Sequence, residues 1–116
     1  MFVAFADERP VGSVSLVDHD MEQPAAELAA LSPWLSGLFV VPSMRRRGVG
    51  SRLVKACEES AERLGNQALF LYTQLGRDFY ERLGWKLRFK TRYEDDFVSV
   101  MARSLRPTTD EAPIIG

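Results

Sequence analysis

The sequence is poor in cysteine and histidine and has no long apolar segment, and each absence narrows the range of functions. Its 116 residues include one cysteine, Cys57, so no internal disulfide can form. Because Cys57 lies inside a helical pattern, we interpret it as a small buried residue and not as a reactive thiol. No run of about 18 apolar residues occurs, which predicts that no helix spans a membrane. No cluster of metal-ligating side chains occurs either, so we expect no metal site.

The charge of the chain is nearly balanced. Fifteen basic and sixteen acidic residues give a formal net charge of −1, so we expect no general attraction to nucleic acid or to an anionic membrane. With 46% hydrophobic residues, the chain suits one globular domain, which we place at residues 1–106, followed by a disordered tail at 107–116. The segment Met1–Arg9 is too short and too charged for a signal peptide, and the default expectation is a cytoplasmic protein.

One stretch of the chain carries most of the functional information. An apolar run, Trp34–Val41, ends before a proline, and a basic turn, Arg45–Gly50, then leads into an amphipathic segment, Val49–Leu64. This order predicts a strand, a tight loop and a helix. Unpaired backbone N–H groups and the dipole at a helix start both attract an anion. The two glycines of the turn allow close backbone approach, so the ligand is predicted to carry phosphate.

Three kinds of phosphate loop compete for this stretch. A dinucleotide site has the pattern G-x-G-x-x-G, but here the third glycine is missing and arginines precede the first. A nucleotide-hydrolysing P-loop needs Gly-Lys-Ser/Thr, whereas Gly50 is followed by Ser51 and Arg52. The third pattern, Arg/Gln-x-x-Gly-x-Gly/Ala, is met by Arg45–Gly50. At this turn the chain resembles the GNAT superfamily of acetyl-CoA-dependent N-acetyltransferases, in which the turn holds the pyrophosphate of coenzyme A.

A second motif supports the resemblance. A continuous apolar strand, Leu69–Thr73, precedes Arg77–Trp85, which is similar to the family's F-Y-x-x-x-G-F/W signature of a short helix ended by a glycine. The spacing between Gly50 and Tyr80 leaves room for one helix, one turn and one strand, as in the family. The resemblance covers nearly the whole chain, from Phe2 to Leu105.

The hydrophobic pattern predicts an α/β fold with a mixed, mostly antiparallel sheet of about six strands and two main helices, which is GNAT-like. Strands are expected at Phe2–Ala6, Val11–Asp18, Trp34–Val41, Ala68–Thr73, Trp85–Tyr93 and Phe97–Leu105, and helices at Val49–Leu64 and Arg77–Leu83. Turns are expected at Asp7–Pro10 and Glu94–Asp96, with a loop at Asp20–Pro33 whose Pro24–Leu31 part could be helical. Gly37 is expected to mark a bulge. In GNAT proteins this strand bulges and splays from its parallel neighbour, which opens a cleft for the pantetheine arm.

The resemblance also assigns roles to individual residues. Tyr80 matches the general acid that protonates the departing thiolate of coenzyme A, and the alternative is a tyrosine that only packs against the sheet. Thr73 stands where family members often carry a cofactor-binding asparagine, although a threonine that ends the strand explains it equally well. At least one arginine of the turn is expected to be only solvated. The residues expected to bind the cofactor are Leu38, Phe39, Val40, Arg45, Arg46, Arg47, Gly48, Val49, Gly50, Ser51 and Thr73.

No general base is evident in the sequence. The strands beside the expected cleft contain no Glu, Asp or His. An imidazole suits proton removal near neutrality, but a single loop histidine such as His19 is more often only solvated. Many GNAT enzymes deprotonate the amine through water. Trp34 and Trp85 are expected in the core or the cleft wall.

The resemblance therefore implies an N-acetyltransferase that uses acetyl-CoA as co-substrate and no metal. The acceptor would be a small-molecule or peptide amine that the sequence does not identify. The alternative is a degenerate GNAT domain that binds acetyl-CoA without turnover, as a sensor or assembly module. Met1 falls close to the family's second strand, so we expect the usual first strand and adjacent helices to be absent. An exposed sheet edge and face then favour a homodimer.

Overall fold

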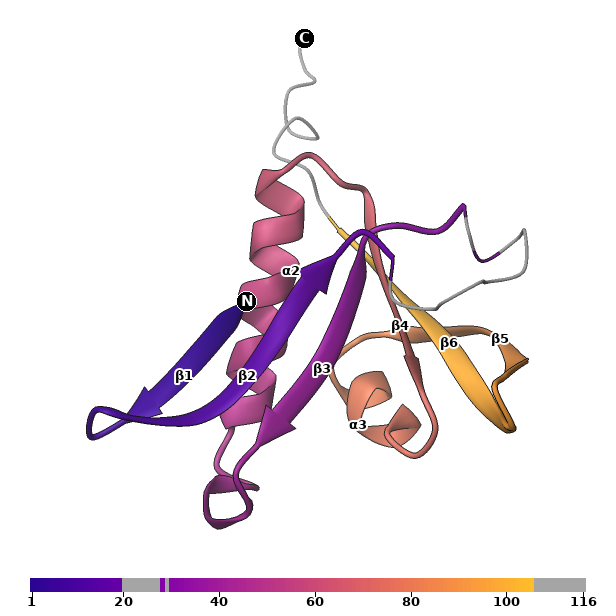
Figure 1. The fold of residues 1–116 in the computed structure, drawn as a ribbon. Helices are drawn as coiled ribbons and strands as arrows, with labels where there is room; N and C mark the ends of the chain where they lie inside the picture. Colours follow the sequence, from indigo (N-terminus) through magenta and orange to yellow (C-terminus); the bar gives the residue numbers. More distant parts are fainter. Residues whose placement is uncertain (20–27, 29, 106–116) are drawn as a thin grey trace, which may run out of the picture.

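The computed structural model describes residues 1–19, 28 and 30–105, which form a six-stranded mixed sheet with two helices (Figure 1). The elements are β1 (Phe2–Ala6), β2 (Arg9–Val17), β3 (Trp34–Val40), a short 3-10 helix η1 (Pro42–Met44), α2 (Val49–Arg63), β4 (Ala68–Thr73), α3 (Arg77–Arg82), β5 (Lys86–Tyr93) and β6 (Asp96–Ser104). The strand order is β1-β2-β3-β4-β6-β5, and all neighbours are antiparallel except β3 and β4. The predicted fold class is confirmed. The tail from residue 107 and most of the expected loop Asp20–Pro33 lie outside the described residues.

The turn between β1 and β2 is tighter than the sequence predicted. Ala6 pairs directly with Arg9, so the turn consists of Asp7 and Glu8, and Pro10 already belongs to β2. Asp7 has φ 52° and Glu8 has φ 69°, the left-handed conformations that a type I′ hairpin turn requires. The longer turn was predicted wrongly because no glycine marks these positions.

The turn between β5 and β6 differs in the same way. Tyr93 pairs with Asp96, which lies in β6, and Glu94 has φ 57°. β1 and β4 have the predicted bounds, and the other element ends agree with the predicted ones or differ by one or two residues, as expected where helices and strands fray.

β3 and β4 separate along their length, and this separation creates the central cleft. The two strands pair in parallel at Trp34 and Phe70. On the other side of β3, the register with β2 slips between Ser13 and Ser15, which leaves an extra residue on β3, and Gly37 has φ 68° there. The predicted bulge at Gly37 is therefore confirmed.

Both helices contribute to one apolar core on the same face of the sheet. α2 lies across the β1–β4 part of the sheet, whereas α3 lies beside β5 (Figure 1). The core includes Leu53 and Cys57 of α2, Leu71 of β4, and Tyr80 and Trp85 around α3. The start of α2 and Tyr80 are thus anchored in the same packed layer. Within the described ranges, no helix is long and apolar enough to cross a membrane.

Candidate active site

The loop between β3 and α2 presents a row of backbone donors without partners. The first backbone bond into α2 runs from Arg52 N to Gly48 O, at 3.1 Å. Within the described part of the chain, the N–H groups from Arg46 to Ser51 donate to no backbone carbonyl. No side chain caps the helix, and its first turn contains no acidic residue. These donors and the helix dipole together form a site for an anion.

Two glycines shape this loop in different ways. Gly48 precedes α2 with φ 84°, a conformation that side chains disfavour. Gly50 lies close to β3 and α3, because a Cβ there would stand 3.4 Å from Phe79 Cζ and 3.7 Å from Val40 Cγ2. Gly48 therefore forms the turn, whereas Gly50 keeps the start of α2 against its neighbours.

A cavity of about 600 Å³ lies beside the loop. Its lining consists of Leu38, Phe39, Val40, Met44, Arg45, Arg46, Gly48, Gly50, Ser51, Phe79, Arg82 and Leu83. All predicted cofactor-binding residues except Arg47, Val49 and Thr73 line it. Arg47 is exposed, and Val49 packs against the core. The cavity therefore joins cationic and backbone N–H groups with an apolar wall, which suits a phosphate ligand that carries an extended arm.

The arginines of the turn differ in their contacts. The Nε of Arg45 donates to the Val40 carbonyl at 2.9 Å, and its guanidinium lies 5.8 Å from the centroid of the Phe39 ring. Arg45 is thus tied to the end of β3. Arg46 lines the cavity and itself has a positive φ of 64°.

The sequence analysis missed the contribution of α3 to this cavity. Phe79 and Arg82 of α3, with Leu83 that follows it, also line the cavity. These positions are three and four residues apart, so they share one face of a helix. The helical spacing in the sequence therefore already placed Arg82 and Leu83 on the same face as Phe79.

A second cavity, of about 470 Å³, lies where β3 and β4 separate. It is lined by Leu35, Ser36, Gly37, Leu38, Leu71, Tyr72, Thr73, Gln74, Tyr80 and Val98. Leu38 lines both this cavity and the one beside the loop, so the two adjoin along β3. No carboxylate or imidazole belongs to this lining in the described residues.

Tyr80 lies between the core and the second cavity. It is 8% exposed, and its ring contacts those of Phe79 and Trp85, with centroids at 5.0 Å and 5.9 Å. Burial, with a smaller contribution from Cys57, raises the pKa of Tyr80 to about 12. No residue that the structure describes hydrogen-bonds its hydroxyl. The side chain is therefore a neutral hydroxyl donor at the cleft over the whole physiological pH range.

Thr73 closes a turn and also lines the second cavity. Its Oγ1 accepts a hydrogen bond from Gly76 N at 2.8 Å, which closes the turn between β4 and α3. The residue also lines the second cavity. The structural role is thus observed, and the cofactor-binding role stays a prediction because the hydroxyl proton is still available to donate.

His19 and the two tryptophans lie away from the cavity linings. His19 is exposed just after β2 and lines neither cavity. Trp34 and Trp85 are each 2% exposed, and the Trp34 indole donates to Leu31 O at 2.8 Å. The expectation that both tryptophans pack in the interior is confirmed. Over residues 1–19, 28 and 30–105, no group of three metal-ligating side chains occurs.

The sequence and the fold place the chain in a known family. Residues 1–85 match the model of the acetyltransferase (GNAT) family, and the chain belongs to that family. No curated protein matches the sequence.

Solved structures share the fold at low sequence identity. An aminoglycoside 6'-N-acetyltransferase complexed with coenzyme A has a TM-score of 0.72 and 19% identity, over 90% of this chain and 72% of that one. An aminoglycoside 6'-acetyltransferase type Ii has a TM-score of 0.71 and 24% identity, over 90% of this chain and 68% of that one. A ribosomal-protein-alanine N-acetyltransferase from Brucella melitensis has a TM-score of 0.70 and 19% identity, over 89% of this chain and 67% of that one. At these identities the likeness establishes the fold.

Proposed function

We propose that the protein is an N-acetyltransferase that moves an acetyl group from acetyl-CoA to a primary amine. The observation that carries the proposal is the continuity of the two cavities along β3. Leu38 lines both, and the consecutive residues Phe79 and Tyr80 line the first and the second cavity respectively. A single ligand with its pyrophosphate at the loop can therefore extend its pantetheine arm along β3 and place its thioester beside Tyr80.

Each part of the site has a defined task in this reaction. The N–H groups of Arg46–Ser51, with the Arg46 and Arg82 guanidinium groups, hold the pyrophosphate. Backbone N–H groups of Leu38–Val40 bind the pantetheine and polarise the thioester carbonyl. The neutral amine attacks that carbonyl, the C–S bond breaks, and the Tyr80 hydroxyl gives its proton to the departing thiolate. Among the described residues no carboxylate or imidazole lines the second cavity, so in this proposal water takes the proton from the amine.

The experiment that tests the function measures release of free coenzyme A with a panel of amines. The panel contains peptide N-termini, lysine side chains, polyamines, aminoglycosides and small metabolic amines. Acetyl-CoA-dependent release with one class, together with an acetylated product in the mass spectrum, supports the proposal. Tight binding of acetyl-CoA with no release for any amine would instead support a domain that binds acetyl-CoA without turnover.

The acceptor, the location and the assembly belong to the same proposal. The solved relatives include enzymes named for aminoglycosides and for a protein alanine, and we infer a small-molecule or peptide amine as acceptor here. We place the protein in the cytoplasm, where the free thiol of Cys57 is compatible with a reducing environment. We also infer a homodimer, because β1 is an open sheet edge with exposed apolar side chains.

A further inference from the structure

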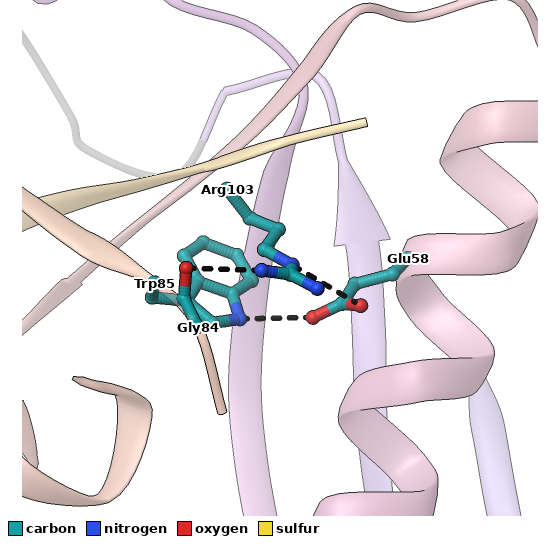
Figure 2. Close-up of polar contacts among 4 residues, drawn as sticks. All are labelled: Glu58, Gly84, Trp85 and Arg103. Atoms are coloured by element: carbon teal, nitrogen blue, oxygen red, sulfur yellow. Dashed lines mark hydrogen bonds and ion pairs between the residues drawn. The ribbon is translucent and has the colours of Figure 1, made fainter. Parts of the chain in front are cut away.

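A polar network connects α2, the turn after α3 and β6 (Figure 2). The Trp85 indole Nε1 donates a hydrogen bond to Glu58 Oε2 at 2.9 Å. The other oxygen of Glu58 lies 3.7 Å from Arg103 Nε, and Arg103 Nη1 donates to Gly84 O at 3.0 Å. The four residues form a closed set of contacts among three elements that are distant in the sequence.

This network is directly attached to Tyr80. The backbone N of Trp85 donates to the carbonyl of Tyr80 at 3.0 Å, and the two rings meet edge to face at a centroid distance of 5.9 Å. Trp85 is 2% exposed, so its indole cannot shift without displacing the Tyr80 ring. Glu58 in turn accepts the hydrogen bond that the indole N–H donates.

The turn after α3 is built to accommodate the network. Gly84 has φ 98°, and a Cβ at this position would collide with the Arg103 guanidinium. A glycine here thus allows Arg103 to lie over the turn while it approaches Glu58. The side chain of Arg103 is 37% exposed and that of Glu58 is 16% exposed, so the buried partner is the carboxylate and its bond to Trp85 is the better-shielded contact.

We propose that Glu58 is a positioning residue that, through the indole of Trp85, fixes the Tyr80 ring relative to α2. The inference rests on the proposed role of Tyr80 as general acid. Since α2 also begins at the phosphate loop, Glu58 sets the distance between the group that holds the pyrophosphate and the group that protonates the thiolate. A displacement of about 1 Å at such a pair is enough to slow an acyl transfer strongly.

The first experiment observes Tyr80 without any substrate. The chain contains three tyrosines, so labelling with 3-fluorotyrosine gives three fluorine NMR signals, and Tyr80→Phe identifies the one from Tyr80. We expect Glu58→Ala and Trp85→Phe to shift or broaden that signal. Glu58→Gln keeps an oxygen that accepts the indole N–H and should leave the signal near its original position. Glu59→Ala is the matched control, since Glu59 is the exposed neighbour on α2.

The second experiment is a double-mutant cycle on turnover. Glu58→Ala should lower kcat by roughly tenfold while the KM for acetyl-CoA stays within about twofold. In the Tyr80→Phe background the same change should cost less than about twofold, because the group that Glu58 positions is already absent. A purely structural residue would lower kcat equally in both backgrounds.

The outcomes separate this inference from the proposed function. If Tyr80→Phe alone leaves kcat unchanged, Tyr80 is not the acid and the positioning role fails, while the acetyltransferase activity itself stands. If Tyr80→Phe slows turnover but Glu58→Ala adds the same loss in both backgrounds, only the positioning role fails. An unmoved Tyr80 fluorine signal in Glu58→Ala overturns the positioning role independently of activity. If Glu58→Ala does not fold, Glu58→Met carries both arms, because it keeps a side chain of similar length and removes the acceptor of the indole N–H.

Discussion

In the proposed reaction, Tyr80 is the residue that protonates the departing thiolate. Its ring is held by Phe79 and Trp85 while it contributes to the lining of the cleft. Desolvation raises the pKa of Tyr80 to about 12, so the hydroxyl keeps its proton over the whole physiological pH range. In the proposed reaction it is the hydrogen-bond and proton donor to the sulfur of the departing group.

Removal of this hydroxyl gives the most direct prediction at the residue scale. Tyr80→Phe preserves the ring and its contacts, so the affinity for coenzyme A, measured by calorimetry, should stay close to that of the original protein. The turnover rate should fall by roughly 10²-fold, because the thiolate must then leave without a proton donor. An unchanged rate would assign the hydroxyl to packing.

Two buried acids predict how stability depends on pH. Burial raises the pKa of Cys57 from 9.0 to about 11, and that of Tyr80 from 10.0 to about 12. As the pH rises above 9, the unfolded chain releases these protons before the folded chain does, so the free energy of unfolding should fall. Urea unfolding at increasing alkaline pH checks this. In Cys57→Ala, the free energy of unfolding should fall less steeply with pH just above pH 9. The same dependence on pH in this variant and in the original protein would contradict the prediction.

At the scale of elements, the start of α2 and one face of α3 line the same cavity. Gly50→Asp should lose most of the affinity for coenzyme A, because it adds a negative charge among the unpaired N–H groups and a side chain against Phe79. Gly50→Ala adds only the Cβ, at 3.4 Å from the Phe79 ring, and should weaken binding much less. Calorimetry on the two variants separates charge from bulk. An unchanged affinity for coenzyme A in Gly50→Asp would contradict the proposal that the loop before α2 binds the pyrophosphate.

Local signals in the sequence were sufficient for much of this surface. The R-x-x-G-x-G turn and the period of α2 depend on neighbouring residues, and the bulge at Gly37 follows from one glycine in an apolar strand. The tight turn at Asp7 and Glu8 was missed because two non-glycine residues adopt positive φ there. The bond between Glu58 and Trp85 joins residues 27 positions apart, and no local pattern encodes such a pairing. Local sequence patterns predicted the helices and strands, whereas the contacts between these elements depend on tertiary packing that no local pattern encodes.

At the scale of the whole molecule, the two edges of the sheet differ in their side chains. The exposed residues of β5 are Lys86, Arg88, Lys90 and Arg92. Two copies that paired through this edge would bring like charges together, which is unfavourable. The β1 edge instead exposes Val3, at 42%, and Phe5, at 65%, and among the described strands β1 pairs only with β2. Self-association is therefore expected through β1.

The last prediction tests this edge. Light scattering at micromolar concentration should report a dimer for the original sequence. Phe5→Lys places a charge on an already exposed position of β1, so it should leave the fold intact and shift the mass to that of a monomer. Lys90→Ala, on the opposite edge, is the matched control and should leave the dimer unchanged, because β5 takes no part in the contact. A monomeric original protein, or a dimer that survives Phe5→Lys and dissociates in Lys90→Ala, would refute pairing through β1.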